Sequence, residues 1–174
     1  QALHTIYQSP GPIYEAGMRS PDWWRFGRAL TAVGVGQGDI VQNCFSYHFT
    51  PAGMMFESAA AAVGAVVVPA GTGQTEMQAI AMANLGVTVY AGTPDYLKAI
   101  LEKGDALGLD LSSVTRACVS AGPLFPALRQ DYEDRGITCL QCYGTADVGH
   151  IAYESLALDG MIVDEGAIVE IVIP

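Results

Sequence analysis

The stretch TCLQCYGTAD, residues 138–147, contains the feature from which both the fold and a candidate site can be inferred. Its first five residues form a short apolar run, which predicts a buried β-strand. A Tyr-Gly turn and the carboxylate of Asp147 follow directly. A carboxylate at the tip of such a strand suits a nucleotide or a metal-bound phosphate. The stretch therefore predicts a strand that leads into a site.

Four further runs of this kind precede the stretch and alternate with segments of helical pattern. They are short, and several are β-branched, as buried parallel strands tend to be. They are Asp39–Phe45, Ala65–Val68, Val87–Ala91 and Arg116–Val119. Alternating strands and helices predict an α/β fold, a parallel sheet flanked by helices on both faces.

The helical segments carry start and end signals. A capping hydroxyl precedes a Pro at Ser20-Pro21, Thr50-Pro51 and Thr93-Pro94. Thr75 and Gln78 have capping-box spacing. Helix ends are expected at Gly34, Gly64, Gly86 and Gly136. Two apolar stripes are expected to face the core: Trp23, Phe26, Leu30 and Val33, and Met77, Ile80, Ala81 and Leu85.

The loops that follow the strands should share one edge of the sheet, because parallel strands joined by right-handed crossovers end on the same side. Ligands of such folds bind outside the carboxyl ends of the strands. The loops expected there are Ser46–Thr50, Pro69–Gln74, Gly92-Thr93, Ser120–Phe125 and Tyr143–His150. The turn before Asp147 is thus expected to belong to a site.

The pattern changes after His150. Three strands are predicted, at Ile151–Glu154, Met161–Val163 and Ala167–Ile173. We therefore divide the chain into an α/β nucleotide- and acyl-binding subdomain, 1–150, and the truncated start of a β-rich subdomain, 151–174. Apolar strand-like segments stand at both ends, so we expect a fragment of a longer protein.

Composition limits the partners. The chain has 174 residues, 18 acidic and 8 Lys or Arg, and an acidic balance opposes binding to nucleic acid or anionic membranes. ATP stays open, because Mg²⁺ and backbone N–H groups can carry the phosphate charge. No apolar run approaches the roughly 20 residues of a membrane span. No secretory leader is expected either, so we expect a cytoplasmic protein.

The four cysteines are Cys44, Cys118, Cys139 and Cys142. Cys139-x-x-Cys142 has redox or zinc spacing, but no second ligand pair accompanies it. Residues three apart in a strand point to opposite faces. We therefore predict four buried, reduced thiols.

Individual residues at the expected edge admit two interpretations each. His48 could orient a substrate or act as an acid or base, or it could be a partly buried His satisfied by backbone. Asp147 could bind Mg²⁺ or cap the turn that follows it. Asp147 and His150 alone are too few ligands for zinc.

Three loops carry weaker signals. Gln8–Pro12 could cradle a phosphate, but Pro10 and Pro12 have no N–H to donate, so a plain turn is favoured. Residues 69–74 lack the spacing of a dinucleotide fingerprint and are expected to form a flexible loop. The small residues 120–123 would let a flat ring approach the backbone.

Several stretches occur in the order of a known family. They are Gly38–Asn43, Pro69–Glu76, Gly92–Leu97, Ser120–Pro123, Tyr143–Gly149 and Val169–Val172. From about Leu3 to Pro174 the chain resembles the middle of an adenylate-forming (AMP-binding) enzyme of the phenylacetate–coenzyme A ligase branch. The resemblance implies the flavodoxin-like subdomain of the large N-terminal domain.

The resemblance also implies a reaction. A carboxylate, phenylacetate or a related aryl acid, attacks the α-phosphate of ATP and gives an acyl-adenylate and pyrophosphate. Coenzyme A then displaces AMP to give a thioester. Mg²⁺ is implied as the metal. A homodimer is left open, and neither nucleic acid nor a membrane is implied as a partner.

Site roles follow from the same resemblance. The implied nucleotide-binding residues are Ser9, Gly11, Ala121, Gly122, Pro123, Tyr143, Gly144 and Thr145. The implied acyl-binding residues are Phe45, Tyr47, His48 and Gly92. Catalytic roles fall to His48, Thr145 and Asp147, and Asp147 is the implied metal ligand.

The chain departs from the family pattern near the phosphates. Ser9-Pro10-Gly11-Pro12 stands where the family has a Ser/Thr/Gly-rich loop with a Lys. Ala146 replaces a Thr, and Asp147 replaces a Glu. The family's ribose-binding Asp and catalytic Lys lie beyond Pro174, so this chain alone is expected to be inactive. The alternatives are a non-catalytic relative that binds a nucleotide, an acyl group or a protein partner, and a flavodoxin-like interaction module.

Overall fold

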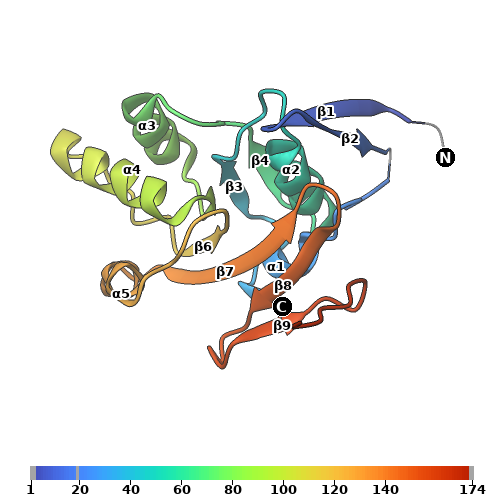
Figure 1. The fold of residues 1–174 in the computed structure, drawn as a ribbon. Helices are drawn as coiled ribbons and strands as arrows, with labels where there is room; N and C mark the ends of the chain where they lie inside the picture. Colours follow the sequence, from blue (N-terminus) through green and yellow to red (C-terminus); the bar gives the residue numbers. More distant parts are fainter. Residues whose placement is uncertain (1–2, 19, 173–174) are drawn as a thin grey trace.

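A seven-stranded sheet forms the centre of the computed structural model, which describes residues 3–18 and 20–172 (Figure 1). The strand order is β4-β3-β5-β6-β7-β8-β9. The parallel strands are β3 (Ile40–Asn43), β4 (Val66–Val68), β5 (Val89–Gly92), β6 (Arg116–Val119) and β7 (Thr138–Thr145). The antiparallel additions are β8 (Gly149–Glu154) and β9 (Met161–Val163). A separate hairpin is formed by β1 (Thr5–Ser9) and β2 (Ile13–Gly17).

Helices cover both faces of the sheet, which confirms the predicted α/β fold. The helices are α1 (Gly27–Ala32), α2 (Ala52–Ala62), α3 (Thr75–Leu85), α4 (Pro94–Leu107) and α5 (Pro126–Asp134). Helices α1 and α2 bury one face, and α3, α4 and α5 bury the other. Adjacent residues of one strand therefore enter different cores: Val89 packs with α1 and α2, and Tyr90 packs with α4. Each fully buried large apolar side chain contributes about 1.5–3 kcal/mol.

The cysteines behave as predicted. All four are buried and free. Cys139 and Cys142 lie in the two different cores, on opposite faces of the sheet. Burial raises the pKa of Cys139 to about 12, so this thiol stays protonated at neutral pH.

The helix starts were predicted with mixed success. Pro94 is the first residue of α4, as expected, and α2 begins one residue after Pro51. The start at Ser20-Pro21 is wrong: residues 21–24 form turns, and α1 begins at Gly27. The capping box at Thr75 is also wrong, because the Gln78 amide donates instead to the carbonyls of Gly71 and Gly73, at 2.8 and 2.9 Å.

This use of Gln78 also explains an error in the apolar stripe of α3. Met77, Ile80 and Leu85 are exposed, whereas Gln78, Ala79 and Met82 are buried. The helix turns its polar Gln78 inward to hold the preceding loop, and the predicted apolar stripe therefore faces outward. The other stripe is correct except at its first position, where Trp24 rather than Trp23 is buried.

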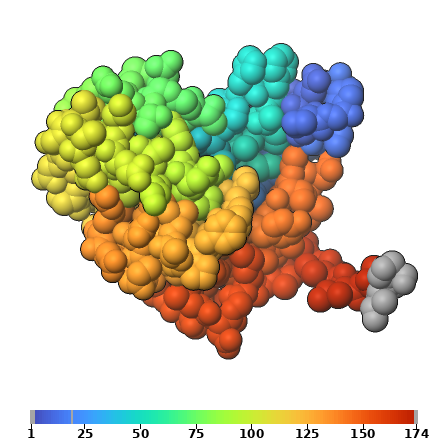
Figure 2. Space-filling model, turned by 60° about the vertical axis from the view of Figure 1, so that its left-hand side comes forward, coloured from blue at the N-terminus to red at the C-terminus, as the bar shows by residue number. Residues whose placement is uncertain are grey.

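The predicted third C-terminal strand is wrong over residues 167–172, which form no strand, and Ile173 lies outside the described residues. The described part of this segment projects from the body of the molecule (Figure 2). Strands β8 and β9 continue the main sheet. A subdomain boundary near residue 150 stays a prediction. Within residues 3–18 and 20–172, no helix has the length and apolarity that a membrane crossing would require.

Candidate functional site

A cavity of about 170 Å³ opens where the carboxyl ends of the strands meet the β1–β2 hairpin and α2. Segments far apart in the sequence line it: Ser9, Phe26, Phe45, Thr50, Pro51, Ala52, Met55, Phe56, Ser120, Ala121, Gly144, Thr145 and Ala146. Five residues with predicted site roles are among them: Ser9, Phe45, Ala121, Gly144 and Thr145. The cavity thus lies at the edge that the crossover rule predicts.

Aromatic side chains form one wall of this cavity. Phe45 stacks on Phe56 with ring centroids 4.2 Å apart, and Phe26 lies 4.8 Å from Phe56. Met55 is a further apolar member of the lining. Of the described residues, those that line the cavity carry no charge. Such a wall suits a flat, uncharged group.

Phe26 and Phe56 were not assigned to the site from the sequence. Phe26 belongs to a helical stripe that predicts core packing, and both residues do pack in the core. Each also lines the cavity. A residue with both roles has no separate signal in the sequence.

The hydroxyl groups of Ser9, Ser120 and Thr145, which line the cavity, already form hydrogen bonds within the protein. Ser9 Oγ donates to Glu15 Oε2 at 2.9 Å, and Ser120 Oγ donates to the Cys142 carbonyl at 2.8 Å. Thr145 Oγ1 accepts from the Val148 N–H at 3.1 Å. Among residues 3–18 and 20–172, no hydrogen bond uses the Thr145 hydroxyl as a donor, so its proton can be donated to a ligand. A phosphate at Ser9 would compete with the Glu15 carboxylate for the serine proton.

The backbone at the rim is closely packed. A Cβ on Gly144 would lie 2.6 Å from the Gly149 carbonyl oxygen and 2.7 Å from Phe26 Cζ, so only Gly fits. Ala121 has a φ of 61°, a left-handed conformation that is costly for a residue with a side chain. Both features lie where the chain leaves a strand.

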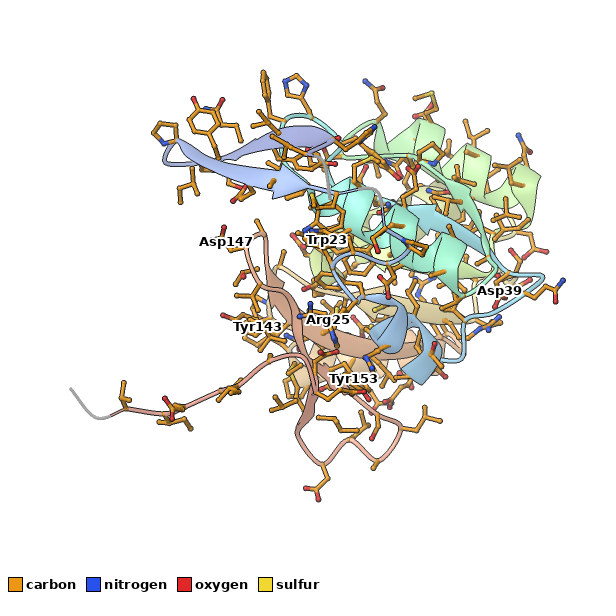
Figure 3. All side chains as sticks on the ribbon, turned by 90° about the vertical axis from the view of Figure 1, so that its right-hand side faces the viewer. Trp23, Arg25, Asp39, Tyr143, Asp147 and Tyr153 are labelled. Carbon is orange, nitrogen blue, oxygen red and sulfur yellow. The ribbon has the colours of Figure 1, made fainter. Side chains whose placement is uncertain are left out.

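The remaining predicted site residues do not line the cavity: Gly11, Tyr47, His48, Gly92, Gly122, Pro123, Tyr143 and Asp147. Tyr143 is 55% exposed. Asp147 is exposed at the tip of the β7–β8 hairpin (Figure 3). Gly11 occupies the turn of the β1–β2 hairpin, as the plain-turn interpretation expects. Their roles in binding stay predictions.

The acyl-binding candidates among these residues have identifiable contacts. His48 is exposed, and the centroid of its ring lies 4.6 Å from that of Phe49. Tyr47 accepts a hydrogen bond from Asn43 Nδ2 at 2.8 Å, and burial raises the pKa of its hydroxyl. Gly92 is buried, and the Tyr90 hydroxyl fills the space that a side chain would need. A substrate could reach His48 without rearrangement, but not Gly92.

A buried ionic cluster lies behind the β7–β8 hairpin. The Asp164 side chain is completely buried and accepts a hydrogen bond from Arg25 Nε at 3.1 Å, and Arg28 Nε lies 3.3 Å from it as a second ion-pair partner. His150 Nδ1 lies 3.1 Å from the same carboxylate. Burial lowers the pKa of His150 and outweighs the opposite effect of Asp164, so the imidazole is neutral at pH 7. Burial tends to raise the pKa of Asp164, but bonds from Gly166 N–H, His150 and Arg25 hold it below its ordinary value.

Sequence reasoning missed Arg25 and Asp164. They are 139 residues apart, and neither belongs to a motif. The local pattern around Asp164 predicts only a turn. No short-range signal could have paired them, because a contact of this separation depends on the whole fold.

The fit of Mg²⁺ can be tested on the donors present. Across the described residues, no group of three or more His, Cys, Asp or Glu side chains is arranged to hold a metal. Mg²⁺ at phosphate sites is held by one or two carboxylates together with phosphate oxygens and water. The exposed carboxylate of Asp147 fits an ion that arrives with a nucleotide, rather than a resident ion.

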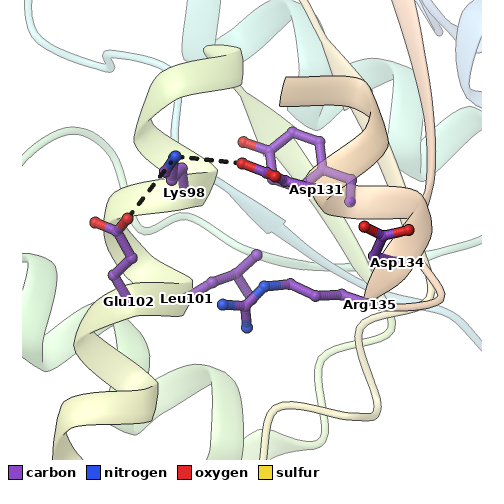
Figure 4. A pocket seen from close by; sticks show the side chains of 7 residues that line it. Lys98, Leu101, Glu102, Asp131, Asp134 and Arg135 are labelled. Carbon is purple, nitrogen blue, oxygen red and sulfur yellow. Dashed lines mark hydrogen bonds and ion pairs between the residues drawn. The ribbon is translucent and has the colours of Figure 1, made fainter. Parts of the chain in front are cut away.

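A second hollow, of about 310 Å³, lies between α4 and α5 (Figure 4). Most of its charged side chains form surface ion pairs: Lys98 with Glu102 and Asp131, and Arg135 with Asp105, which lies outside the lining. Asp134 accepts a hydrogen bond from the Gln130 amide instead. It shares no lining residue with the cavity at the sheet edge. Because both of its cations, Lys98 and Arg135, are already engaged by carboxylates, we assign it no role in binding.

Comparison with known proteins identifies sequence relatives. The AMP-binding enzyme family model matches residues 23–168. Phenylacetate-coenzyme A ligase of Escherichia coli is 31% identical over 128 residues, 70% of this chain and 29% of the relative. The Aromatoleum evansii protein of the same name is 29% identical over 124 residues, 70% of this chain and 28% of the relative. The chain thus spans less than a third of these curated relatives.

Solved structures share the fold. A 2-hydroxyisobutyryl-CoA ligase in complex with 2-HIB-AMP and CoA has a TM-score of 0.82 at 16% identity, over 92% of this chain and 38% of that one. The anthranilate CoA ligase AuaEII in complex with anthranoyl-AMP has a TM-score of 0.69 at 17% identity, over 89% and 32%. At these identities the likeness concerns the fold alone.

Proposed function

The chain belongs to the AMP-binding enzyme family, and we propose that the full-length protein is an ATP-dependent acid–thiol ligase. Its substrates would be a carboxylic acid, ATP and coenzyme A, and its products an acyl thioester, AMP and pyrophosphate. The observation that carries this proposal is the uncharged, aromatic-walled cavity directly beside the turn Gly144–Ala146. An apolar acyl group in the cavity would bring its carboxylate toward that turn.

The walls favour an aryl acid, phenylacetate or a relative of it. Phe26, Phe45 and Phe56 all line the cavity, and the ring centroids of Phe45 and Phe26 lie 4.2 and 4.8 Å from that of Phe56. Aromatic rings favour such stacked or offset contacts with one another, so an aryl group could join this cluster. The sequence relatives named phenylacetate-coenzyme A ligase support the same class. A charged ring substituent would find no partner among the lining residues.

Residues of this chain would bind and orient the substrates and the Mg²⁺ ion. The free proton of Thr145 can donate to a phosphate or carboxylate oxygen at the rim. Asp147 would hold Mg²⁺ that enters with ATP, and the ion would neutralise phosphate charge. We place the activity in the cytoplasm, because four buried free thiols suit a reducing compartment.

Pyrophosphate release from the full-length protein tests the proposal. With Mg·ATP we expect release that depends on added phenylacetate or benzoate, and thioester formation once coenzyme A is present. Succinate, which is charged at both ends, should give at least tenfold less, because an unpaired charge in an apolar site is costly. Acid-independent release, or none with any aryl acid, would refute the ligase.

A non-catalytic, nucleotide-binding relative is the second candidate. The bond from Ser9 to Glu15 favours it, because the serine proton is committed where a phosphate would lie. Calorimetric titration with Mg·ATP separates the two candidates. Binding without pyrophosphate release would support this second candidate.

Asp147→Asn tests the metal role. The substitution keeps the side-chain shape and removes the charge, so Mg²⁺-dependent nucleotide binding should weaken by roughly tenfold, about 1.4 kcal/mol. The measurement is the apparent affinity for ATP at several Mg²⁺ concentrations. Asp159→Asn is the matched control, because Asp159 is also an exposed Asp in a turn. Equal affinities for both variants would remove Asp147 from the metal site.

A further inference from the structure

Arg25 connects three parts of the molecule through one guanidinium group. Its Nη2 donates to the carbonyl oxygens of Val148 and His150, at 2.9 and 3.0 Å. Its Nε donates to Asp164 Oδ1 at 3.1 Å. The side chain is one-third exposed, and it lies between the hairpin and the segment after β9 (Figure 3).

The carbonyls that Arg25 binds belong to the β7–β8 hairpin, whose turn contains Asp147 and directly follows Thr145. Inside the turn, the Val148 N–H donates to Thr145 Oγ1 at 3.1 Å. On the other side of Val148, its carbonyl is bound by Arg25. Val148 is thus held at both ends of its backbone, and it is the residue directly after Asp147. These two bonds hold the backbone of the residue that follows Asp147.

The backbone around Arg25 reinforces the contact. The His150 N–H donates to the Trp24 carbonyl at 2.8 Å. Arg25 itself has a φ of 65°, which is costly for a residue with a side chain and persists where surrounding contacts enforce it. The next residue, Phe26, enters the cavity wall. One segment therefore places both the cavity wall and the turn.

Arg28 provides a natural comparison. Its Nε lies 3.3 Å from the same Asp164 carboxylate, and its Nη2 pairs with Glu165 at 2.5 Å. No hydrogen bond joins Arg28 to the turn in the described part of the chain. Arg25 and Arg28 thus share a carboxylate, and only Arg25 holds the turn.

We propose that Arg25 is a positioning residue, which fixes the Thr145–Asp147 turn against the cavity through the carbonyls of Val148 and His150. Asp164 orients the guanidinium from behind. The inference rests on the proposed function only for its kinetic consequence. The structural consequence, an ordered turn, stands independently of any activity.

Matched variants Arg25→Lys and Arg28→Lys of the full-length protein test this inference. Lys keeps the charge beside Asp164, so the buried carboxylate stays paired, but one ammonium lacks the planar fork that reaches three acceptors. In Arg25→Lys, hydrogen exchange of peptides that span residues 144–151 should quicken roughly fivefold, as expected from losing a hydrogen bond. In Arg28→Lys it should stay within about twofold of wild type.

The kinetic readout is the Mg²⁺ concentration for half-maximal pyrophosphate release. Loss of a residue that supports a metal ligand typically weakens metal affinity by 10–100-fold, so Arg25→Lys should raise this concentration roughly tenfold. A merely structural defect would lower the amount of active enzyme and leave the Mg²⁺ dependence unchanged. Arg28→Lys should leave both unchanged.

The outcomes separate this inference from the proposed function. If the wild type releases no pyrophosphate, the ligase proposal fails, and the exchange measurement still decides the role of Arg25. Equal exchange at residues 144–151 in both variants would overturn the inference. So would global unfolding of Arg25→Lys with Arg28→Lys intact, because Arg25 would then support the fold as a whole.

Discussion

Gly149→Ala is expected to lower the free energy of unfolding by about 3 kcal/mol, which combines left-handed strain with overpacking. Gly149 has a φ of 78°. An added Cβ would lie 2.7 Å from the Trp24 carbonyl oxygen and 3.0 Å from the Trp24 Cα. Both atoms belong to the backbone, so relief requires a shift of the chain rather than a side-chain rotation. Urea unfolding of the wild type and the variant measures the loss.

Gly160→Ala is the control for this prediction. Gly160 has the same φ of 78°, and nothing lies within 4 Å of its added Cβ. Only the conformational cost remains, about 1 kcal/mol. The difference between the two variants measures the contact between the hairpin and Trp24. Equal losses would mean that the backbone near Trp24 moves aside freely.

The overall fold could be predicted because its signals are local. Short apolar runs that alternate with helical patterns specify strands and helices without reference to distant contacts. Gly34, Gly64, Gly86 and Gly136 all have positive φ at or near the helix ends where they were expected. One error arose because a side chain holds a neighbouring loop. The Gln78 amide donates to the carbonyls of Gly71 and Gly73, and the face that α3 buries therefore contains this polar residue.

The candidate site could be predicted only in part. The edge of the sheet follows from topology, and it correctly gathers Phe45, Ala121 and Thr145. Phe56 could not be assigned, because a residue on a buried helix face looks the same whether or not it borders a cavity. The Arg25 side chain donates hydrogen bonds to backbone carbonyls more than 120 residues away. Every residue has a backbone carbonyl, so the sequence does not indicate which carbonyls Arg25 will contact.

The stretch Gly38–Asn43, one of those that carry the resemblance to the family, stabilises the fold and does not border the cavity. Asp39 precedes β3, far from the Asp147 turn (Figure 3). Asn43 donates to the Tyr47 hydroxyl and to the Gly53 carbonyl, each at 2.8 Å. Neither residue lines the cavity. Buried polar groups need specific partners, and both residues have them in this fold.

Asp39→Ala is expected to cost about 3 kcal/mol of unfolding free energy, because it breaks a largely buried ion pair. Arg116 contacts both carboxylate oxygens, at 2.6 and 3.0 Å. The Gly36 N–H and the Thr88 hydroxyl donate to the same group at 2.9 and 2.8 Å. The substitution removes the acceptor for all of these donors and leaves Arg116 without its carboxylate partner, although its Nη1 keeps the bond to the Gly34 carbonyl. Thermal and urea unfolding at pH 7 measure the loss.

The pH dependence of the free energy of unfolding provides a second test of the contribution of Asp39. Burial tends to raise the pKa of this carboxyl, but the bonds from Gly36, Thr88 and Arg116 outweigh it and hold the pKa below the ordinary value. The stabilisation is therefore complete above the unfolded-state pKa of about 3.9. It is lost as the pH falls through the folded-state value. Between pH 5 and pH 2, roughly, Asp39→Ala should lose less stability than the wild type does.

Asp105→Ala supplies the contrast, since Asp105 pairs with Arg135 at 2.7 Å on the surface. Water and salt screen that pair, so we expect a loss below about 1 kcal/mol at pH 7. Added NaCl should reduce it further. The Asp39 pair is better shielded, with side chains that are 12% and 26% exposed, and its contribution should persist in salt. If the two variants lose the same stability with the same salt dependence, Asp39 acts only as a surface charge. The ion pair between Asp39, which precedes β3, and Arg116 in β6 would then not stabilise the sheet.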